Sequence, residues 1–169
     1  EHCIKTLLTG GEDVEILIVD DGSKDATAEI ADRYQKKYPA IIKAIHQENG
    51  GHGAAVNTGI ANATGLYFKV VDSDDWVDEE SYHKILAKLR EIVGGSTTLD
   101  MFISNFVYEK QGAPHKKVMK YTRMFPEDEI FTWSDVRHIS KGHYAFRYLP
   151  YPVIKGLRTG TAKTHLLCG

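Results

Sequence analysis

Short apolar runs alternate with longer segments of helical periodicity in the first two thirds of the chain. The apolar runs are rich in β-branched residues, as is typical of strands buried on both faces of a parallel sheet. These runs are residues 15–19, 41–46 and 66–71. The segments between and after them carry apolar residues every three or four positions, which predicts amphipathic helices. These segments are residues 26–38, 54–63 and 79–93. The alternation predicts an α/β fold with a mostly parallel sheet flanked by helices.

The strand assignment makes a packing prediction. Because the runs are apolar on both faces, we expect four of their residues to be fully buried in adjacent or nearly adjacent parallel strands. These residues are Ile16, Ile18, Val70 and Val71.

The two ends of the chain have weaker patterns. Residues 1–9 resemble the later part of a helix that stops at Gly10 and Gly11. Residues 100–108 predict a further strand, which a turn at 111–114 would pair with residues 116–122. A short helix is predicted at 134–139, and residues 142–169 show no periodicity, so no structure is assigned there. We expect a single domain, in which residues 1–125 bind the ligand and residues 126–169 are the remainder.

Composition and charge exclude several classes of protein. The 21 Lys and Arg residues nearly balance the 23 Asp and Glu residues, and neither sign forms a long run. This argues against nucleic acid as a partner. No apolar stretch is long enough to span a bilayer, and Cys3 and Cys168 lack the spacing of a zinc site. We expect a cytoplasmic location, with peripheral attachment to the inner face of the membrane in a longer protein.

Two acidic clusters follow predicted strands. Asp20-Asp21-Gly22-Ser23 comes after the first strand, and Asp72-Ser73-Asp74-Asp75 comes after the third. Ligands of open parallel sheets bind outside the carboxyl ends of the strands, so both clusters are expected to face one crevice. Their carboxylates would repel one another unless a hard divalent cation, Mg²⁺ or Mn²⁺, joined them and bridged to a phosphorylated ligand.

Other interpretations of these residues stay open at this stage. Residues 20–23 have the composition of a polar turn, and the glycine-rich residues 49–53 match neither common phosphate-binding motif. A phospho-receiver signalling domain is the main alternative, because the acidic pair after the first strand and Asp72 as phosphoacceptor would suit one. A Rossmann oxidoreductase is disfavoured, since GxGxxG does not follow the first strand.

Three motifs stand in order along the chain: VDDGSKD at 19–25, NGGHGAAVNTG at 49–59 followed by ATG at 63–65, and DSDDW at 72–76. In this order and spacing they resemble family 2 glycosyltransferases of the GT-A fold. The resemblance covers roughly residues 1–110. It implies that a sugar is transferred, with inversion, from a nucleotide diphosphate donor, usually a UDP-sugar, to a saccharide or lipid-linked saccharide acceptor. Bacterial cell-surface polysaccharide synthesis is the expected setting.

The resemblance implies roles for residues of the nucleotide site. Asp21 resembles the carboxylate that accepts hydrogen bonds from the base or ribose, and Asp20 supports it. Asn49 and Gly50 would form a wall beside the nucleotide.

The resemblance also implies a DxD motif at Asp72-Ser73-Asp74. Asp74, helped by Asp72 or Asp75, would bind Mn²⁺ or Mg²⁺, while Asp72 also reaches the ribose and Ser73 adjoins the nucleotide-sugar.

Two departures from the family pattern concern the termini. The family's first strand does not precede Glu1, so the sheet position beside the strand ending at Asp20 is expected to be open, and exposed edges are expected to favour self-association. Glu127, Asp128 and Asp135 come too early to be the general base, so no catalytic base is assigned. A transferase that binds donor without turnover is therefore a further alternative.

Overall fold

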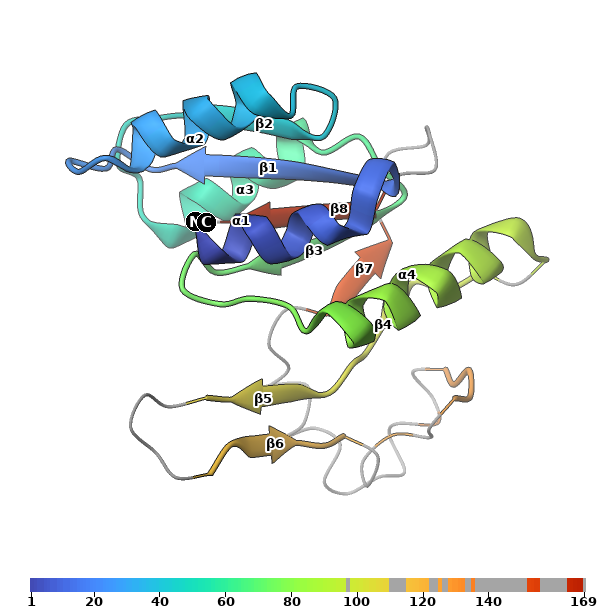
Figure 1. The fold of residues 1–169 in the computed structure, drawn as a ribbon. Helices are drawn as coiled ribbons and strands as arrows, with labels where there is room; N and C mark the ends of the chain where they lie inside the picture. Colours follow the sequence, from blue (N-terminus) through green and yellow to red (C-terminus); the bar gives the residue numbers. More distant parts are fainter. Residues whose placement is uncertain are drawn as a thin grey trace. The chain divides into compact units, whose positions relative to one another are not determined.

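The computed structural model describes most of the first 121 residues and shorter stretches after them. The described residues are 1–96, 98–109, 115–121, 125, 128–132, 135, 152–155 and 164–168. The chain forms two compact units, drawn in Figure 1. Unit 1 contains Glu1–Met101 and Val153–Gly169, and unit 2 contains Phe102–Pro152.

Unit 1 begins with alternating helices and strands. In order they are α1 (His2–Leu7), the 3₁₀ helix η1 (Leu8–Asp13), β1 (Val14–Asp20), α2 (Thr27–Lys37), β2 (Ile42–His46), α3 (His52–Asn62), β3 (Tyr67–Val71) and α4 (Glu79–Gly94). The strands and helices predicted between residues 15 and 94 are thus all present. Side-chain carboxylates fix two helix starts: Asp25 accepts the Thr27 N–H at 3.0 Å, and Asp78 accepts the Ser81 N–H at 2.9 Å.

The sheet of unit 1 is mostly parallel, as predicted. Its order is β2-β1-β8-β3-β7-β4, where β4 is Met101–Phe102, β7 is Val153–Lys155 and β8 is Thr164–Cys168. β1 runs parallel to β2 and β8, β8 runs parallel to β3, and β7 pairs with β3 in the antiparallel sense. The predicted core positions Ile16, Ile18, Val70 and Val71 are all buried, which confirms the packing prediction.

The sheet position beside β1, which was expected to be open, is filled. β8 pairs with β1 on one side and with β3 on the other, with Cys168 level with both Ile18 and Val71. β1 is therefore an interior strand, and the expectation of an unpaired edge there is wrong. The reason is that residues 153–155 and 164–168, to which the sequence assigned no structure, pair through their backbones with strands distant in sequence. They also return the chain to unit 1.

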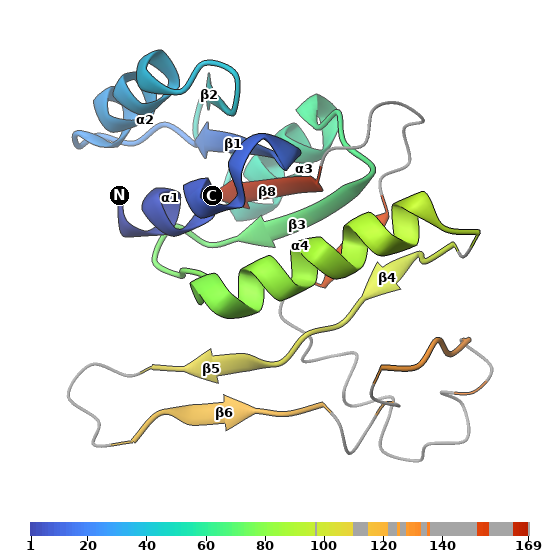
Figure 2. The ribbon, with the colours of Figure 1, turned by 45° about the vertical axis from the view of Figure 1, so that its right-hand side comes forward.

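Helices cover both faces of this sheet. One apolar cluster joins α1, α2 and α4 to the sheet and includes Leu7, Ile16, Tyr34 and Leu86. α3 lies on the opposite side of the sheet from α1, as Figures 1 and 2 show. The layers leave the carboxyl ends of β1 and β3 at one edge of unit 1.

Unit 2 contains a two-stranded antiparallel sheet. β5 (Phe106–Tyr108) pairs with β6 (Lys117–Met119), as predicted from the hairpin pattern. The strand predicted over 100–108 is interrupted at residues 103–105, which separate β4 from β5. The predicted turn at 111–114 and the predicted helix at 134–139, except Asp135, lie outside the described residues.

Gly10 is a position where packing requires glycine. It is buried in η1, and a Cβ there would lie 2.5 Å from Val14 Cγ2 and closer still to the Tyr82 hydroxyl. Gly10→Ala is expected to lower the free energy of unfolding by about 1–3 kcal/mol, as overpacking of a core does, which thermal unfolding would measure. Gly94→Ala, with no atom within 4 Å of the added Cβ, is the control and is expected to be neutral or stabilising. Equal melting temperatures for the two variants would contradict the packing argument.

Candidate functional site

A cavity of about 430 Å³ lies in unit 1 at the carboxyl ends of β1 and β3. Both acidic loops reach it: Asp20 and Asp21 of the first loop and Ser73 of the second line it, whereas Asp72, Asp74 and Asp75 do not. The remaining polar residues that line it are Glu1, Ser23, Thr27 and His52. β8 ends at Cys168, level with Ile18 and Val71, so Asp20 and Asp72 both lie beyond the end of that strand. The cavity thus occupies the position where open parallel sheets bind ligands.

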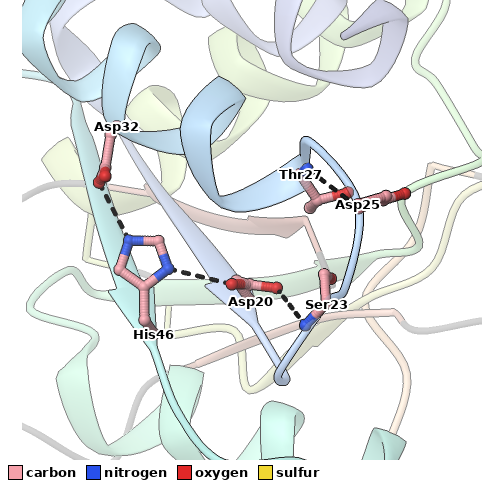
Figure 3. Close-up of polar contacts among 6 residues, drawn as sticks. All are labelled: Asp20, Ser23, Asp25, Thr27, Asp32 and His46. Atoms are coloured by element: carbon pink, nitrogen blue, oxygen red, sulfur yellow. Dashed lines mark hydrogen bonds and ion pairs between the residues drawn. The ribbon is translucent and has the colours of Figure 1, made fainter.

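Asp20 is the buried carboxylate of this site, with 5% of its surface exposed. Its Oδ1 accepts the Ser23 backbone N–H at 3.0 Å, and its Oδ2 lies 3.1 Å from His46 Nδ1 (Figure 3). Burial alone raises the pKa of the Asp20 carboxyl, but the hydrogen bonds from Ser23 and His46 together outweigh it and lower this pKa. Asp20 is therefore an ionised, hydrogen-bonded residue that shapes the turn after β1.

Asp21 joins that turn to the glycine-rich loop before α3. Its Oδ1 accepts the Gly50 N–H at 2.9 Å and the Gln47 Nε2–H at 2.6 Å, and its Oδ2 accepts the Gly51 N–H at 2.7 Å. These bonds, led by that from Gly50, lower the pKa of Asp21. The structure thus brings Asp21 and Gly50, two residues singled out from sequence, into direct contact.

Gly22 allows Asn49 to lie close to the turn after β1. Its φ is +75°, and a Cβ there would lie 2.9 Å from the Asn49 backbone nitrogen. Only glycine combines this left-handed backbone with so close an approach. The turn of residues 20–23 and the loop of residues 49–51 therefore pack backbone against backbone.

Two site residues at the end of β2 were missed from the sequence. Gln47 donates to Asp21 and accepts the Thr58 hydroxyl at 2.5 Å, so its amide links the turn to α3. His46 lies opposite Asp20 in the parallel register of β1 and β2. The signal available was their position at the end of β2, His46 as its last residue and Gln47 directly after it, beside the strand that ends at Asp20.

The second acidic cluster forms a hydrogen-bonded turn. The Asp75 N–H donates to the Asp72 carbonyl at 2.9 Å. Burial, together with the charges of Asp74 and Asp72, raises the pKa of Asp75. Burial lowers the pKa of the nearby Lys69 ammonium to about 8, although Asp75 and Asp72 act in the opposite direction.

These carboxylates suit a hard divalent cation in their chemistry. They are oxygen donors that repel one another, and a cation would relieve that repulsion. Within the described part of the chain, no group of three His, Cys, Asp or Glu side chains is arranged to hold a metal ion. Mg²⁺ commonly takes only one or two carboxylates and completes its shell with water and phosphate oxygens. The donor set fits a cation that arrives with a phosphorylated ligand.

A Rossmann-like sheet with a cavity of mixed polar and apolar lining at its strand ends is typical of a ligand-binding α/β domain, and comparison with known families identifies which one. The family described as "Glycosyl transferase family 2" matches residues 1–149. The chain therefore belongs to glycosyl transferase family 2, and its fold is the GT-A fold expected from the three motifs. This membership sets aside the phospho-receiver and oxidoreductase alternatives.

Relatives from bacteria agree with this membership. The chain is 44% identical over 86 residues to the uncharacterised glycosyltransferase EpsJ of Bacillus subtilis, covering 50% of this chain and 25% of EpsJ. It is 39% identical over 108 residues to the putative glycosyltransferase EpsH of the same organism, covering 63% of this chain and 29% of EpsH. Over 77 residues it is 35% identical to the B. subtilis minor teichoic acid biosynthesis protein GgaB, covering 46% of this chain and 9% of GgaB. The matched region is thus a minor part of each relative.

Proposed function

We propose that unit 1 binds the nucleotide diphosphate part of a sugar donor, with UDP-sugar as the donor class, in the cavity at the ends of β1 and β3. The observation that carries this proposal is the convergence of Asp20, Asp21 and Ser73 on one cavity at the strand ends of a family 2 domain. The reaction is transfer of the sugar to an acceptor hydroxyl with inversion at the anomeric carbon.

The turn after β1 provides the nucleotide side of the proposed site. The Asp21 carboxylate already accepts three hydrogen bonds, so in the proposed site it fixes the loop of Asn49 and Gly50 and offers its remaining acceptor capacity to the base or ribose. Asp20 orients this turn by accepting the Ser23 backbone N–H. Ionised acceptors bound by backbone N–H groups make the strong hydrogen bonds that fix orientation.

The turn after β3 provides the phosphate side. Asp74, with Asp72 or Asp75, is proposed to hold Mg²⁺ or Mn²⁺, and Ser73 and Asp72 lie beside the donor. When bound, such a cation stabilises the charge that grows on the departing diphosphate. The side chains themselves supply oxygen ligands on an accessible turn.

The acceptor is proposed to be a saccharide or a lipid-linked saccharide of a bacterial cell-surface polymer. The relative GgaB, named for minor teichoic acid biosynthesis, supports this setting. No helix in the described part of the chain is long and apolar enough to cross a membrane. A cytoplasmic location, with the full-length protein at the inner face of the membrane, completes the proposal.

Thermal unfolding in the presence of nucleotides tests this function. UDP with Mn²⁺ is expected to raise the melting temperature more than ADP, GDP or UDP alone, because a ligand that binds only the folded state stabilises it. Asp74→Asn is expected to remove most of the Mn²⁺ dependence. Glu91→Gln, an exposed α4 residue paired with Lys88, is the matched control. Equal stabilisation by all nucleotides, or unchanged Mn²⁺ dependence in Asp74→Asn, would contradict the proposal.

A further inference from the structure

His46 lies between two carboxylates. Its Nδ1 is 3.1 Å from Asp20 Oδ2, and its Nε2 is 3.0 Å from Asp32 Oδ1 on α2 (Figure 3). Ionised carboxylates only accept hydrogen bonds, whereas a neutral imidazole has a single N–H. Both contacts are hydrogen bonds only when both ring nitrogens carry a proton. The geometry therefore calls for the imidazolium form of His46.

The buried Asp20 gives this cation a role. A buried carboxylate is stable as an anion only when it is paired and hydrogen-bonded. Among the residues that the structure describes, His46 is the one basic side chain within ion-pairing distance of Asp20. The other titratable groups that act on this part of the site are the carboxylates of Asp21, Asp25 and Asp32.

The pair is connected to the proposed nucleotide site on both sides. Asp20 Oδ1 holds the Ser23 N–H and so fixes the turn that carries Asp21. The residue after His46, Gln47, donates its side-chain amide N–H to Asp21, and its backbone N–H donates to the Asp20 carbonyl at 3.0 Å. Consecutive residues at the end of β2 thus contact consecutive acids at the end of β1.

We propose that the His46 imidazolium is a positioning residue for nucleotide binding, which locks the Asp20–Ser23 turn by bridging Asp20 and Asp32. This inference rests on the proposed function for its ligand. His46 acts through Asp20 and does not touch the donor.

The proposal predicts how nucleotide affinity changes with pH. The hydrogen bond to Asp32, followed by that to Asp20, raises the pKa of His46 above its ordinary value. The lock is therefore complete at pH values below the ordinary pKa of histidine and is lost as pH rises through the raised pKa. The lowered pKa of Asp20 sets the acid limit, because the lock is lost again as pH falls through it.

Two measurements from about pH 6 to about pH 9 test this inference. Calorimetry gives the UDP affinity, and NMR follows the amide signal of Ser23. In the unchanged chain, affinity is expected to fall roughly tenfold across the titration of His46, the lower end of the scale of one charge-assisted hydrogen bond. The Ser23 amide shift is expected to follow the same midpoint without nucleotide. His46→Asn keeps an N–H near Asp20 but no charge, so its affinity is expected to be lower and free of this pH step.

Asp32→Asn is the second variant, and its side chain on α2 is 64% exposed. It removes one of the two carboxylates that favour the imidazolium, so the midpoint of both curves is expected to move to lower pH. His83→Gln, on α4, is the control and is expected to leave both curves unchanged. UDP binding with a pH profile identical in all proteins, or a Ser23 amide that does not titrate, would overturn the positioning role. Absence of UDP binding by the unchanged chain at every pH would instead overturn the proposed function and the nucleotide part of this inference.

Discussion

Replacing Val70 by aspartate is expected to leave unit 1 unfolded. Val70 is 6% exposed and lies on β3, which pairs on both sides within the sheet. A carboxylate there would be buried without a cationic partner, which costs about 4 kcal/mol or more in proteins. The free energy of unfolding of a native domain is only about 5–15 kcal/mol. Far-ultraviolet circular dichroism and the melting temperature would measure the loss.

The control for this prediction is an apolar-to-aspartate change at an exposed position. Ile60 on α3 is 48% exposed, so Ile60→Asp is expected to keep the native spectrum. A soluble Val70→Asp protein with an unchanged melting temperature would mean that β3 is not an interior strand.

The strands and helices of the first 94 residues could be predicted because their signals are local. The β1 run from Ile16 to Val19 is continuously apolar, and α4 begins after the capping residue Asp78 and carries a regular apolar stripe. Such patterns depend on burial of each element's own face, so they appear in the sequence itself. The break between β4 and β5 was not predicted, although the polar Ser104 and Asn105 interrupt the apolar run there.

β8 shows which part of a fold local patterns leave undetermined. Thr164–Cys168 is short, and its place is set by hydrogen bonds to β1 and β3, which are far away in the sequence. Backbone groups pair regardless of side-chain identity, so little in these five residues specifies that position. The central place of the strand follows from the assembled sheet.

The candidate site also contains some features that the sequence predicted and others that it did not. Carboxylates at two strand ends were visible as composition, and strand-end geometry predicted that they share a crevice. The bonds of Asp21 to Gly50 and Gly51 depend on how two loops approach each other. His46 and Gln47 acquire their roles only from the register of β2 on β1.

Asp21→Ala is expected to weaken UDP binding at least tenfold while unit 1 stays folded. The substitution removes the acceptor of the Gly50 and Gly51 N–H groups and of the Gln47 amide, so three donors lose the bond that holds the loop. Each charge-assisted bond of this kind is worth roughly tenfold in an equilibrium constant. Calorimetric titration with UDP and Mn²⁺ at a fixed pH would measure the loss.

Two further variants separate the roles of shape and charge at this position. Asp21→Asn keeps one acceptor oxygen but turns an N–H₂ group toward a backbone donor, so its UDP affinity is expected to fall between those of the unchanged chain and Asp21→Ala. Asp13→Ala removes an equal charge from an exposed acid, paired with Arg90, that precedes β1, and is expected to bind UDP normally. Because Asp13 lies at the opposite end of β1 from the cavity, equal losses in Asp13→Ala and Asp21→Ala would mean that overall charge, and not the loop contact, governs nucleotide affinity.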